Sequence, residues 1–190
     1  MIVVDIEATG LDPQTCSILS IGAISLNKPE KTFYGECKIW DGANYTQEAL
    51  DINGFSIEEI TDNSKQSEIK LMKKFLSWLE QFDEKIIAGQ HPHALDVPIM
   101  KEACKRGGIN YPLTQKTVDL HACFYYYLIS NGEDIPIKED GNSDISLDSI
   151  ATYFNLGEEP QPHNALTGAK YEAECFSRIF YGKNLLPEFS

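Results

Sequence analysis

The chain has 190 residues, which is enough for one domain with a sizeable core and too few for two domains of ordinary size. Its hydrophobic fraction of 42% and charged fraction of 24% are typical of a soluble protein, and no apolar run reaches the roughly 18 residues of a membrane span. The net charge of −13 argues against a broad phosphate-binding surface, because nucleic-acid affinity usually depends on Lys and Arg. Acidic residues that gather divalent cations would bring phosphate in by another electrostatic route.

The N-terminus and the cysteines indicate an ordinary cytoplasmic protein. Residues 2–4 are apolar but lack the basic flank and cleavage site of a signal peptide, so we expect a cytoplasmic location. The five cysteines contain no Cys-x-x-Cys pair, so neither a zinc site nor a disulfide framework is indicated. We expect reduced and mostly buried thiols.

Strands dominate the first part of the chain. Residues 1–7, 17–26 and 32–39 are rich in β-branched and aromatic residues and are separated by turn formers, which predicts three strands. Apolar side chains then recur at three- and four-residue steps over residues 66–82, which predicts a helix. Residues 85–88 are predicted to form another short strand.

Helices dominate the second part. Residues 96–106 are predicted to form a helix, with a proline in its first turn and two glycines after its end. Helical spacing also covers residues 118–128, 146–156 and 164–180, while residues 131–142 are predicted to be an exposed loop.

This order of elements predicts an α/β fold. Early strands followed by alternating helix and strand indicate a mixed sheet, antiparallel at its start, with helices packed on its faces. We expect a single domain over residues 1–182 and a short C-terminal tail over residues 183–190.

Two acids in the first strand are the strongest chemical signal. Asp5 and Glu7 lie two residues apart, so their side chains leave the same face of the strand, with Val4 and Ile6 on the other. Like charges this close repel and raise each other's pKa unless a cation lies between them, and oxygen ligands suit Mg²⁺ or Mn²⁺. The alternative is a solvated strand end, and spacing alone leaves both interpretations open.

Three strings in the chain resemble the motifs of one enzyme family. They are Asp-Ile-Glu-Ala-Thr-Gly-Leu at residues 5–11, Ile-Ile-Ala-Gly-Gln-His at 86–91 followed by Leu-Asp-Val-Pro-Ile-Met at 95–100, and His-Asn-Ala-Leu-Thr-Gly-Ala at 163–169. In order and spacing they are similar to the DEDD superfamily of 3′–5′ exonucleases, in its DEDDh branch, which includes polymerase III ε-type proofreading subunits, RNase T and Trex-type nucleases. The resemblance covers nearly the whole chain and implies a ribonuclease H-like fold with a mixed, mainly five-stranded sheet flanked by helices.

The resemblance also implies a catalytic site. Within the family the acids hold two Mg²⁺ or Mn²⁺ ions, so Asp5 would bridge both, Glu7 would complete one side and Asp96 would support the other. His163 would be the general base, since an imidazole pKa near 6.5 lets it accept a proton close to neutral pH.

The turn after the first acids is expected to bind substrate. The substrate-binding residues that the resemblance implies are Ala8, Thr9, Gly10 and Leu11. The expected substrate is the 3′ end of single-stranded DNA or RNA, or a short oligonucleotide, and the product is a nucleoside monophosphate. No membrane partner is expected, and a homodimer stays open.

Position 168 departs from the family's pattern. The motif requires a fourth carboxylate five residues after His163, and the chain has Gly168 there. The glycine is consistent with an engineered change, a natural loss of activity, or a shift of the ligand to Glu172, one helical turn along the same face. We expect Gly168→Asp to create or restore activity at little cost in backbone stability, because Asp has the better helix propensity.

Other features have simpler explanations. Residues 124–127 are four consecutive aromatics, which would suit base stacking, but consecutive helical positions point in different directions and favour core packing of some and exposure of others. Asp119 precedes an apolar helix and is expected to cap it. The rival function is a non-catalytic nucleic-acid-binding or protein-interaction module that keeps the fold, whereas a dinucleotide enzyme would need a Gly-x-Gly-x-x-Gly turn that the first strand lacks.

Overall fold

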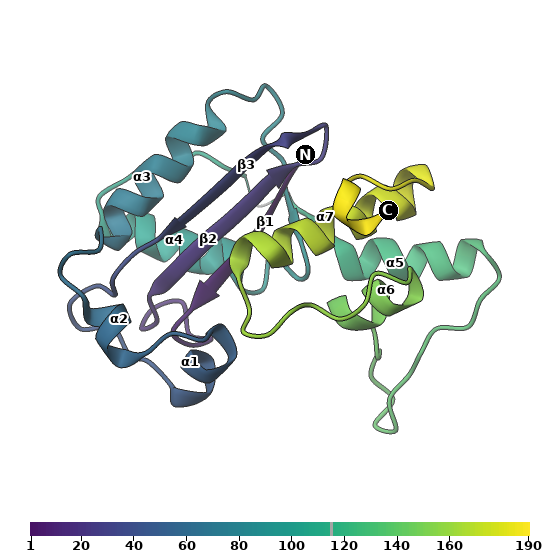
Figure 1. Cartoon of the computed structure of the whole chain (residues 1–190), viewed down its shortest axis with the longest axis horizontal. Coiled ribbons are helices and arrows are strands. Elements are labelled where there is room, and N and C mark those ends of the chain that lie inside the picture. The colour runs from purple at the N-terminus through teal and green to yellow at the C-terminus, as the bar shows by residue number, and fades with distance from the viewer. Residues whose placement is uncertain (115) are drawn as a thin grey trace.

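One mixed sheet forms the centre of the protein. The computed structural model describes residues 1–114 and 116–190. The strands are β1 (Ile2–Ala8), β2 (Ile18–Ser25), β3 (Lys28–Glu36), β4 (Ile87–Gly89) and β5 (Val118–Asp119). Their order across the sheet is β3-β2-β1-β4-β5, with antiparallel pairing from β3 to β1 and parallel pairing from β1 to β5. The expected five-stranded mixed sheet is thus confirmed (Figure 1).

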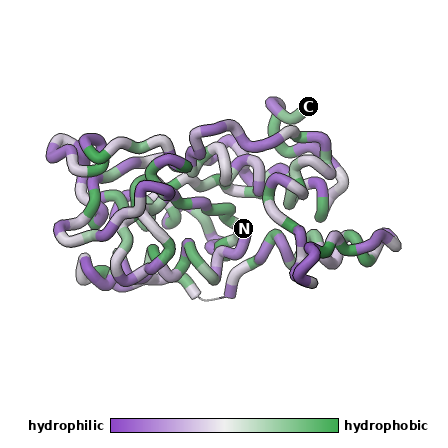
Figure 2. The backbone as a smooth tube through the Cα atoms, turned by 90° about the horizontal axis from the view of Figure 1, so that it is seen from below, coloured by the Kyte–Doolittle hydropathy of each residue, from purple (hydrophilic) through white to green (hydrophobic). Residues whose placement is uncertain are grey.

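Helices cover both faces of this sheet. They are α1 (Gln47–Asn53), α2 (Ile57–Thr61), α3 (Glu68–Leu79), α4 (Asp96–Arg106), α5 (Leu120–Ser130), α6 (Leu147–Tyr153) and α7 (Ala165–Tyr181), with a 3₁₀ turn at Pro187–Phe189. Figure 1 shows α7 crossing one face of the sheet, α3 and α4 on the other, and α5 and α6 beside α7. The N-terminus lies near the middle of the long axis, and the C-terminus lies toward the end that carries α5 and α6 (Figure 1, Figure 2).

The central strand divides the core between the two faces. Ile2, Val4 and Ile6 of β1 are buried in the apolar cluster that contains the residues of α3 and α4. Val3 is buried in the second cluster, with residues of α5, α6 and α7. Since side chains alternate along a strand, Asp5 belongs with Val3 on the α7 side. The alternation expected from the sequence therefore sends the first acids toward α7.

A glycine on β2 brings α7 close to these acids. Gly22 pairs with Asp5 across the β1–β2 ladder. A Cβ atom on Gly22 would collide with the backbone of Ala165 and Leu166, in the first turn of α7. The absence of a side chain at Gly22 therefore lets the start of α7 lie directly on the sheet beside Asp5.

Several elements differ from the sequence-based expectation. Strand β3 starts at Lys28, four residues before the predicted start, because a tight turn directly after β2 leads into it. Strand β5 has only two residues, at the start of a segment predicted to be helical. Helices α1 and α2 were not predicted, since their lengths of seven and five residues are too short to show a clear apolar period.

The expected C-terminal tail is packed against α7. The Glu174 carboxylate accepts hydrogen bonds from the backbone N–H groups of Leu185 and Leu186, at 2.8 and 3.0 Å. Arg178 donates to the carbonyl oxygen of Phe189 at 2.9 Å. Leu186 is buried, so residues 183–190 contribute to the core of the domain.

The expectations for the cysteines, for Asp119 and for the aromatic run are confirmed. Four of the five cysteines are buried and all five are free thiols. Asp119 caps α5 by accepting a hydrogen bond from Ala122 N–H at 3.3 Å. Of the aromatic run, Phe124 is buried whereas Tyr126 is 72% exposed. Across the described residues, no helix combines the length and apolar character that crossing a membrane requires.

Candidate active site

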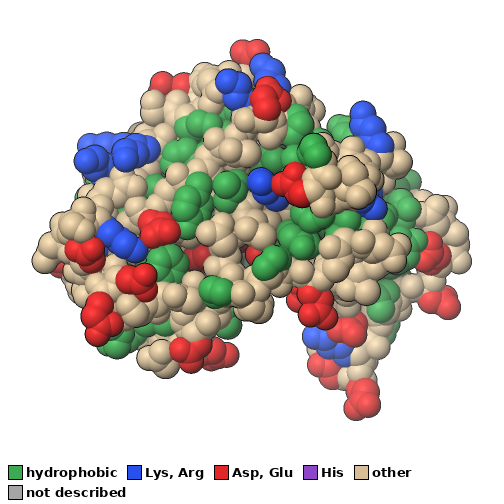
Figure 3. All heavy atoms as spheres, in the orientation of Figure 1, with side chains coloured by type: hydrophobic (Ala, Val, Ile, Leu, Met, Phe, Trp, Pro, Cys, Tyr) green, Lys and Arg blue, Asp and Glu red, His purple; other side chains and the backbone are tan. Residues whose placement is uncertain are grey.

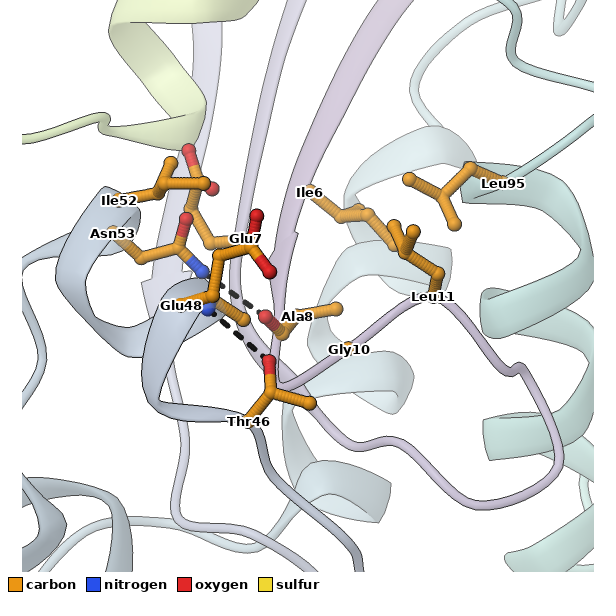
Figure 4. A pocket seen from close by; sticks show the side chains of 11 residues that line it. Ile6, Glu7, Ala8, Gly10, Leu11, Thr46, Glu48, Ile52, Asn53 and Leu95 are labelled. Atoms are coloured by element: carbon orange, nitrogen blue, oxygen red, sulfur yellow. Dashed lines mark hydrogen bonds between the residues drawn. The ribbon is translucent and has the colours of Figure 1, made fainter.

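A cleft of about 400 Å³ opens where β1 ends. Its walls are formed by Ile6, Glu7, Ala8, Gly10, Leu11, Thr46, Glu48, Ala49, Ile52, Asn53 and Leu95. In Figure 4, Glu7 lies between the side chains of α1, such as Ile52 and Asn53, and the apolar pair Leu11 and Leu95. The volume lies within the range of small-ligand pockets.

Short local contacts hold the cleft wall together. Asn53 donates from its side-chain amide to the carbonyl oxygen of Ala8 at 3.0 Å, which fixes α1 to the end of β1 (Figure 4). Thr46 caps α1 through a hydrogen bond from Ala49 N–H at 3.2 Å. The α1 wall is therefore anchored directly to the strand that carries the acids.

Three secondary-structure elements bring the predicted acids together. Asp5 and Glu7 come from β1, Asp96 is the first residue of α4, and α7 contributes position 168. Glu7 and Asp96 are only 7% and 5% exposed. Carboxylates are almost never this buried without a partner, so the site has an unusual concentration of negative charge.

The pKa values of Glu7 and Asp96 reflect this burial. Desolvation, and then repulsion from Glu159, raises the pKa of Glu7 from 4.5 to about 7. Desolvation also raises the pKa of Asp96 to about 7, and Glu7 adds to the increase, while backbone N–H groups of Asp96 and Ile6 act against it. Both side chains therefore titrate close to neutral pH in the metal-free protein.

Two further carboxylates, those of Glu159 and Glu172, lie near the predicted three, Asp5, Glu7 and Asp96. Burial raises the pKa of Asp5 well above its ordinary value, and repulsion from Glu172, Glu7, Asp96 and Glu159 adds to it. Burial likewise raises the pKa of Glu172, followed by repulsion from Asp96. Five carboxylates thus act on one another around the end of β1.

These residues fit a hard divalent cation by the chemistry of their donors. Glu172 is 4% exposed, and its Oε2 atom is buried without a hydrogen-bond partner within residues 1–114 and 116–190. The Oε1 atom of Glu159 is buried and unpartnered in the same way. In the described part of the chain, no three His, Cys, Asp or Glu side chains already have the geometry of a metal-ligand set. A cation would supply the missing partner for these oxygens and relieve the repulsion.

His163 lies on the loop that leads into α7. Its backbone N–H donates to the carbonyl oxygen of Ile52 at 3.0 Å, so the loop is attached to the α1 wall of the cleft. The positive form of His163 lowers the pKa of Glu159, although burial raises that pKa overall. His163 therefore lies within electrostatic range of Glu159.

The predicted substrate turn is divided between inside and outside. Leu11 is 80% exposed at the mouth of the cleft, whereas Thr9 is fully buried. The Thr9 hydroxyl donates to Asn44 O at 2.6 Å and accepts from Ser17 N–H at 2.9 Å. Of the two side chains, Leu11 is free to contact a ligand, and Thr9 organises the turn.

Gly168 is buried against the acids. A Cβ atom at this position would collide with Asp5 Oδ2 and would lie 3.3 Å from Glu159 Oε1. The expectation from helix propensity concerns the backbone alone, and packing adds a cost that it omits, because Asp5 has to rotate away to admit a side chain here. Helix propensity is outweighed by packing at this buried position.

Glu159 was missed from the sequence, as was the α1 wall. Glu159 lies in the irregular segment between α6 and α7, where no periodic pattern points toward the site. The available signal was its position four residues before His163. Helix α1 gave no signal beyond the capping threonine at its start.

The sheet order, the helices on both faces and the acids at the end of β1 define the ribonuclease H-like exonuclease class. A family model described as Exonuclease (RNase T) matches residues 2–176. The chain belongs to this exonuclease family. A comparison of the sequence with curated proteins found no match.

Solved structures share this fold at low sequence identity. Exonuclease I from E. coli in complex with a dT13 oligonucleotide has a TM-score of 0.73 and 18% identity, over 93% of this chain and 40% of that protein. Cell-death related nuclease 4 has a TM-score of 0.74 and 14% identity, over 96% of this chain and 64% of that protein. The chain thus spans about two fifths of the length of Exonuclease I.

Proposed function

We propose that this protein is a metal-dependent 3′–5′ exonuclease that hydrolyses phosphodiester bonds at the 3′ ends of single-stranded nucleic acid. The observation that carries the proposal is the set of four carboxylates that repel Asp5, one of which, Glu7, lines a cleft of about 400 Å³. Family membership supports the hydrolytic reaction. The oligonucleotides bound to the E. coli Exonuclease I structures, dT13 and dA16, support a single-stranded substrate.

Each residue has a defined task in this proposal. Asp5, Glu7 and Asp96 would hold Mg²⁺ or Mn²⁺. Two such ions, when bound, lower the pKa of water and stabilise the leaving 3′-oxygen. His163 takes the proton from the attacking water, the role of a general base. Exposed Leu11 contacts the terminal base at the mouth of the cleft.

Gly168 favours a second candidate function. Without a carboxylate at this position, one ligand of the family's site is missing, which is consistent with a module that binds nucleic acid without cutting it. The burial of Glu7, Asp96 and Glu172 favours catalysis, because a binding module gains nothing from buried like charges that cost stability.

Cleavage of labelled oligonucleotides distinguishes the two functions. The parent protein, Asp5→Asn and His163→Ala are incubated with matched 5′-labelled DNA and RNA 20-mers in Mn²⁺, with EDTA as a control. We expect stepwise shortening from the 3′ end by the parent protein only. Mn²⁺ should also raise the melting temperature of the parent more than that of Asp5→Asn, since a lost ligand weakens linkage to the folded state. Mn²⁺ binding without any cleavage would favour the non-catalytic module.

A further inference from the structure

The volume that a side chain at position 168 would fill is occupied by other acids. Asp5 Oδ2 would clash with a Cβ atom at this position, and Glu159 Oε1 lies 3.3 Å from the same point. Glu159 therefore brings a carboxylate into the immediate surroundings of the missing ligand, from a different part of the chain. The neighbouring loop, not α7, supplies this negative charge.

Contacts at both ends hold the Glu159 segment against the domain. The hydroxyl of Tyr171, on α7, donates to the carbonyl oxygen of Glu158 at 3.2 Å. Five residues after Glu158, the backbone N–H of His163 donates to the carbonyl oxygen of Ile52 at 3.0 Å. Residue 159 is thus placed between a helix contact and the α1 wall, beside the acids.

Two buried carboxylate oxygens at this place have no hydrogen-bond partner in the described residues. Glu172 is only 4% exposed, and its Oε2 atom has no hydrogen-bond partner in the described residues. Of the carboxylates that repel Asp5, Glu172 has the strongest effect. Glu159 Oε1 is a second buried oxygen without a partner in the same residues. Unpaired buried carboxylate oxygens cost stability, and a divalent cation bound at Glu159 Oε1 would remove that cost for this oxygen.

Glu159 fits the role of fourth ligand better than Glu172. One oxygen of Glu172 accepts a hydrogen bond from Gln90 N–H at 2.8 Å, and the other lies 3.2 Å from the position of a Cβ on Gly89, at β4. Glu172 is therefore held toward β4. The backbone N–H of Asn164 also hydrogen-bonds the carboxylate of Glu159, but its Oε1 atom has no partner in the described residues and lies 3.3 Å from the position of a Cβ on Gly168.

We propose that Glu159 supplies from the loop the metal-binding carboxylate that Gly168 lacks, so that the cation site consists of Asp5, Glu7, Asp96 and Glu159. The inference rests on the proposed metal-dependent function. Glu172 adds a buried negative charge behind this set.

Mn²⁺ binding, measured by calorimetry and by electron paramagnetic resonance, tests the inference without any cleavage assay. The variants are Glu159→Gln and the neighbouring Glu158→Gln, whose side chain is exposed and serves as the matched control. We expect Glu159→Gln to weaken Mn²⁺ binding by about tenfold or more, and Glu158→Gln to leave it unchanged. In EDTA, Glu159→Gln should melt at the same or a higher temperature than the parent, because it removes a repelling charge.

A double variant adds a rescue that a purely structural role for Glu159 would not produce. Adding Gly168→Asp to Glu159→Gln returns a carboxylate to the site and should restore most of the lost Mn²⁺ affinity. Parent-like Mn²⁺ binding by Glu159→Gln would overturn the inference and leave the proposed function standing. If the folded parent protein binds no Mn²⁺, both the proposed function and the inference are overturned.

Discussion

The metal-free protein should lose stability as the pH rises from 5 to 8, and Glu7 allows the size of this loss to be worked out. Its pKa rises from 4.5 to about 7 in the folded state. A group with a raised folded-state pKa contributes stability that is fully present below its unfolded pKa and is lost as the pH rises through the folded value. At 1.36 kcal/mol per pH unit the shift corresponds to at most about 3 kcal/mol, and rearrangement of the carboxylates reduces this to about 1 to 3 kcal/mol.

Urea unfolding in EDTA at pH 5, 6, 7 and 8 measures the effect. Glu7→Gln should show a smaller loss of unfolding free energy over this range than the parent. Glu48→Gln is the matched control, because its side chain is exposed on the same cleft and should keep the parent's pH dependence. Saturating Mn²⁺ should flatten the parent's profile, since the cation replaces the protons. An unfolding free energy that is equally pH-dependent in parent and Glu7→Gln would refute the reasoning.

Three further outcomes follow from the packing and the charge. Arg106→Met should lower the unfolding free energy by about 3 kcal/mol in urea titrations, because the buried carboxylate of Glu68, 1% exposed, loses its ion pair at 2.9 Å. Lys105→Met is the control, since the side chain of Lys105 is exposed, and equal losses in the two variants would contradict this prediction. Gly168→Asp should have a lower melting temperature than the parent in EDTA, by the equivalent of about 1 to 3 kcal/mol, and Mn²⁺ should raise its melting temperature more than it raises that of the parent. A higher melting temperature in EDTA would show that Asp5 does not obstruct the position. Fluorescence anisotropy with a long single-stranded nucleic acid should show weak binding, with an affinity that depends on salt concentration less steeply than about six phosphate contacts would require. The reason is the net charge of −13 and the acidic side chains along much of the lower edge in Figure 3. Tight binding with a steeper salt dependence would contradict this prediction.

The sequence predicts the sheet and the main helices because their apolar patterns are long. Helix α4 begins and ends at the predicted residues, where Asp96 opens the first turn and Gly107 follows the last. The two-residue strand β5 and the five-residue helix α2 are too short for a pattern to develop, and only their neighbours in space give them their form. Tertiary contacts decide such elements.

In the candidate site, too, the residues marked by a local sequence pattern were predicted, and those placed by tertiary contacts were not. Asp5 and Glu7 follow from a two-residue spacing, and Asp96 and His163 from matching motifs. Glu159 could not be found in this way, since its proximity to Asp5 depends on how the loop before α7 folds back. The obstruction at position 168 was equally hidden, because it arises where α7 and β1 meet and is absent from either segment alone.

The hydrogen bond between His163 and Ile52 joins the loop before α7 to the α1 wall of the cleft. Ile52, on α1, lines the cleft, and its carbonyl oxygen accepts the hydrogen bond from the backbone N–H of His163. Under the proposed function, a bound terminal nucleotide that displaced Ile52 would also displace the backbone of His163, so the position of the nucleotide and the alignment of the imidazole would be coupled. A badly fitting end would still bind but would leave the imidazole misplaced. Selection among nucleic-acid ends would then act on the rate of cleavage rather than on affinity.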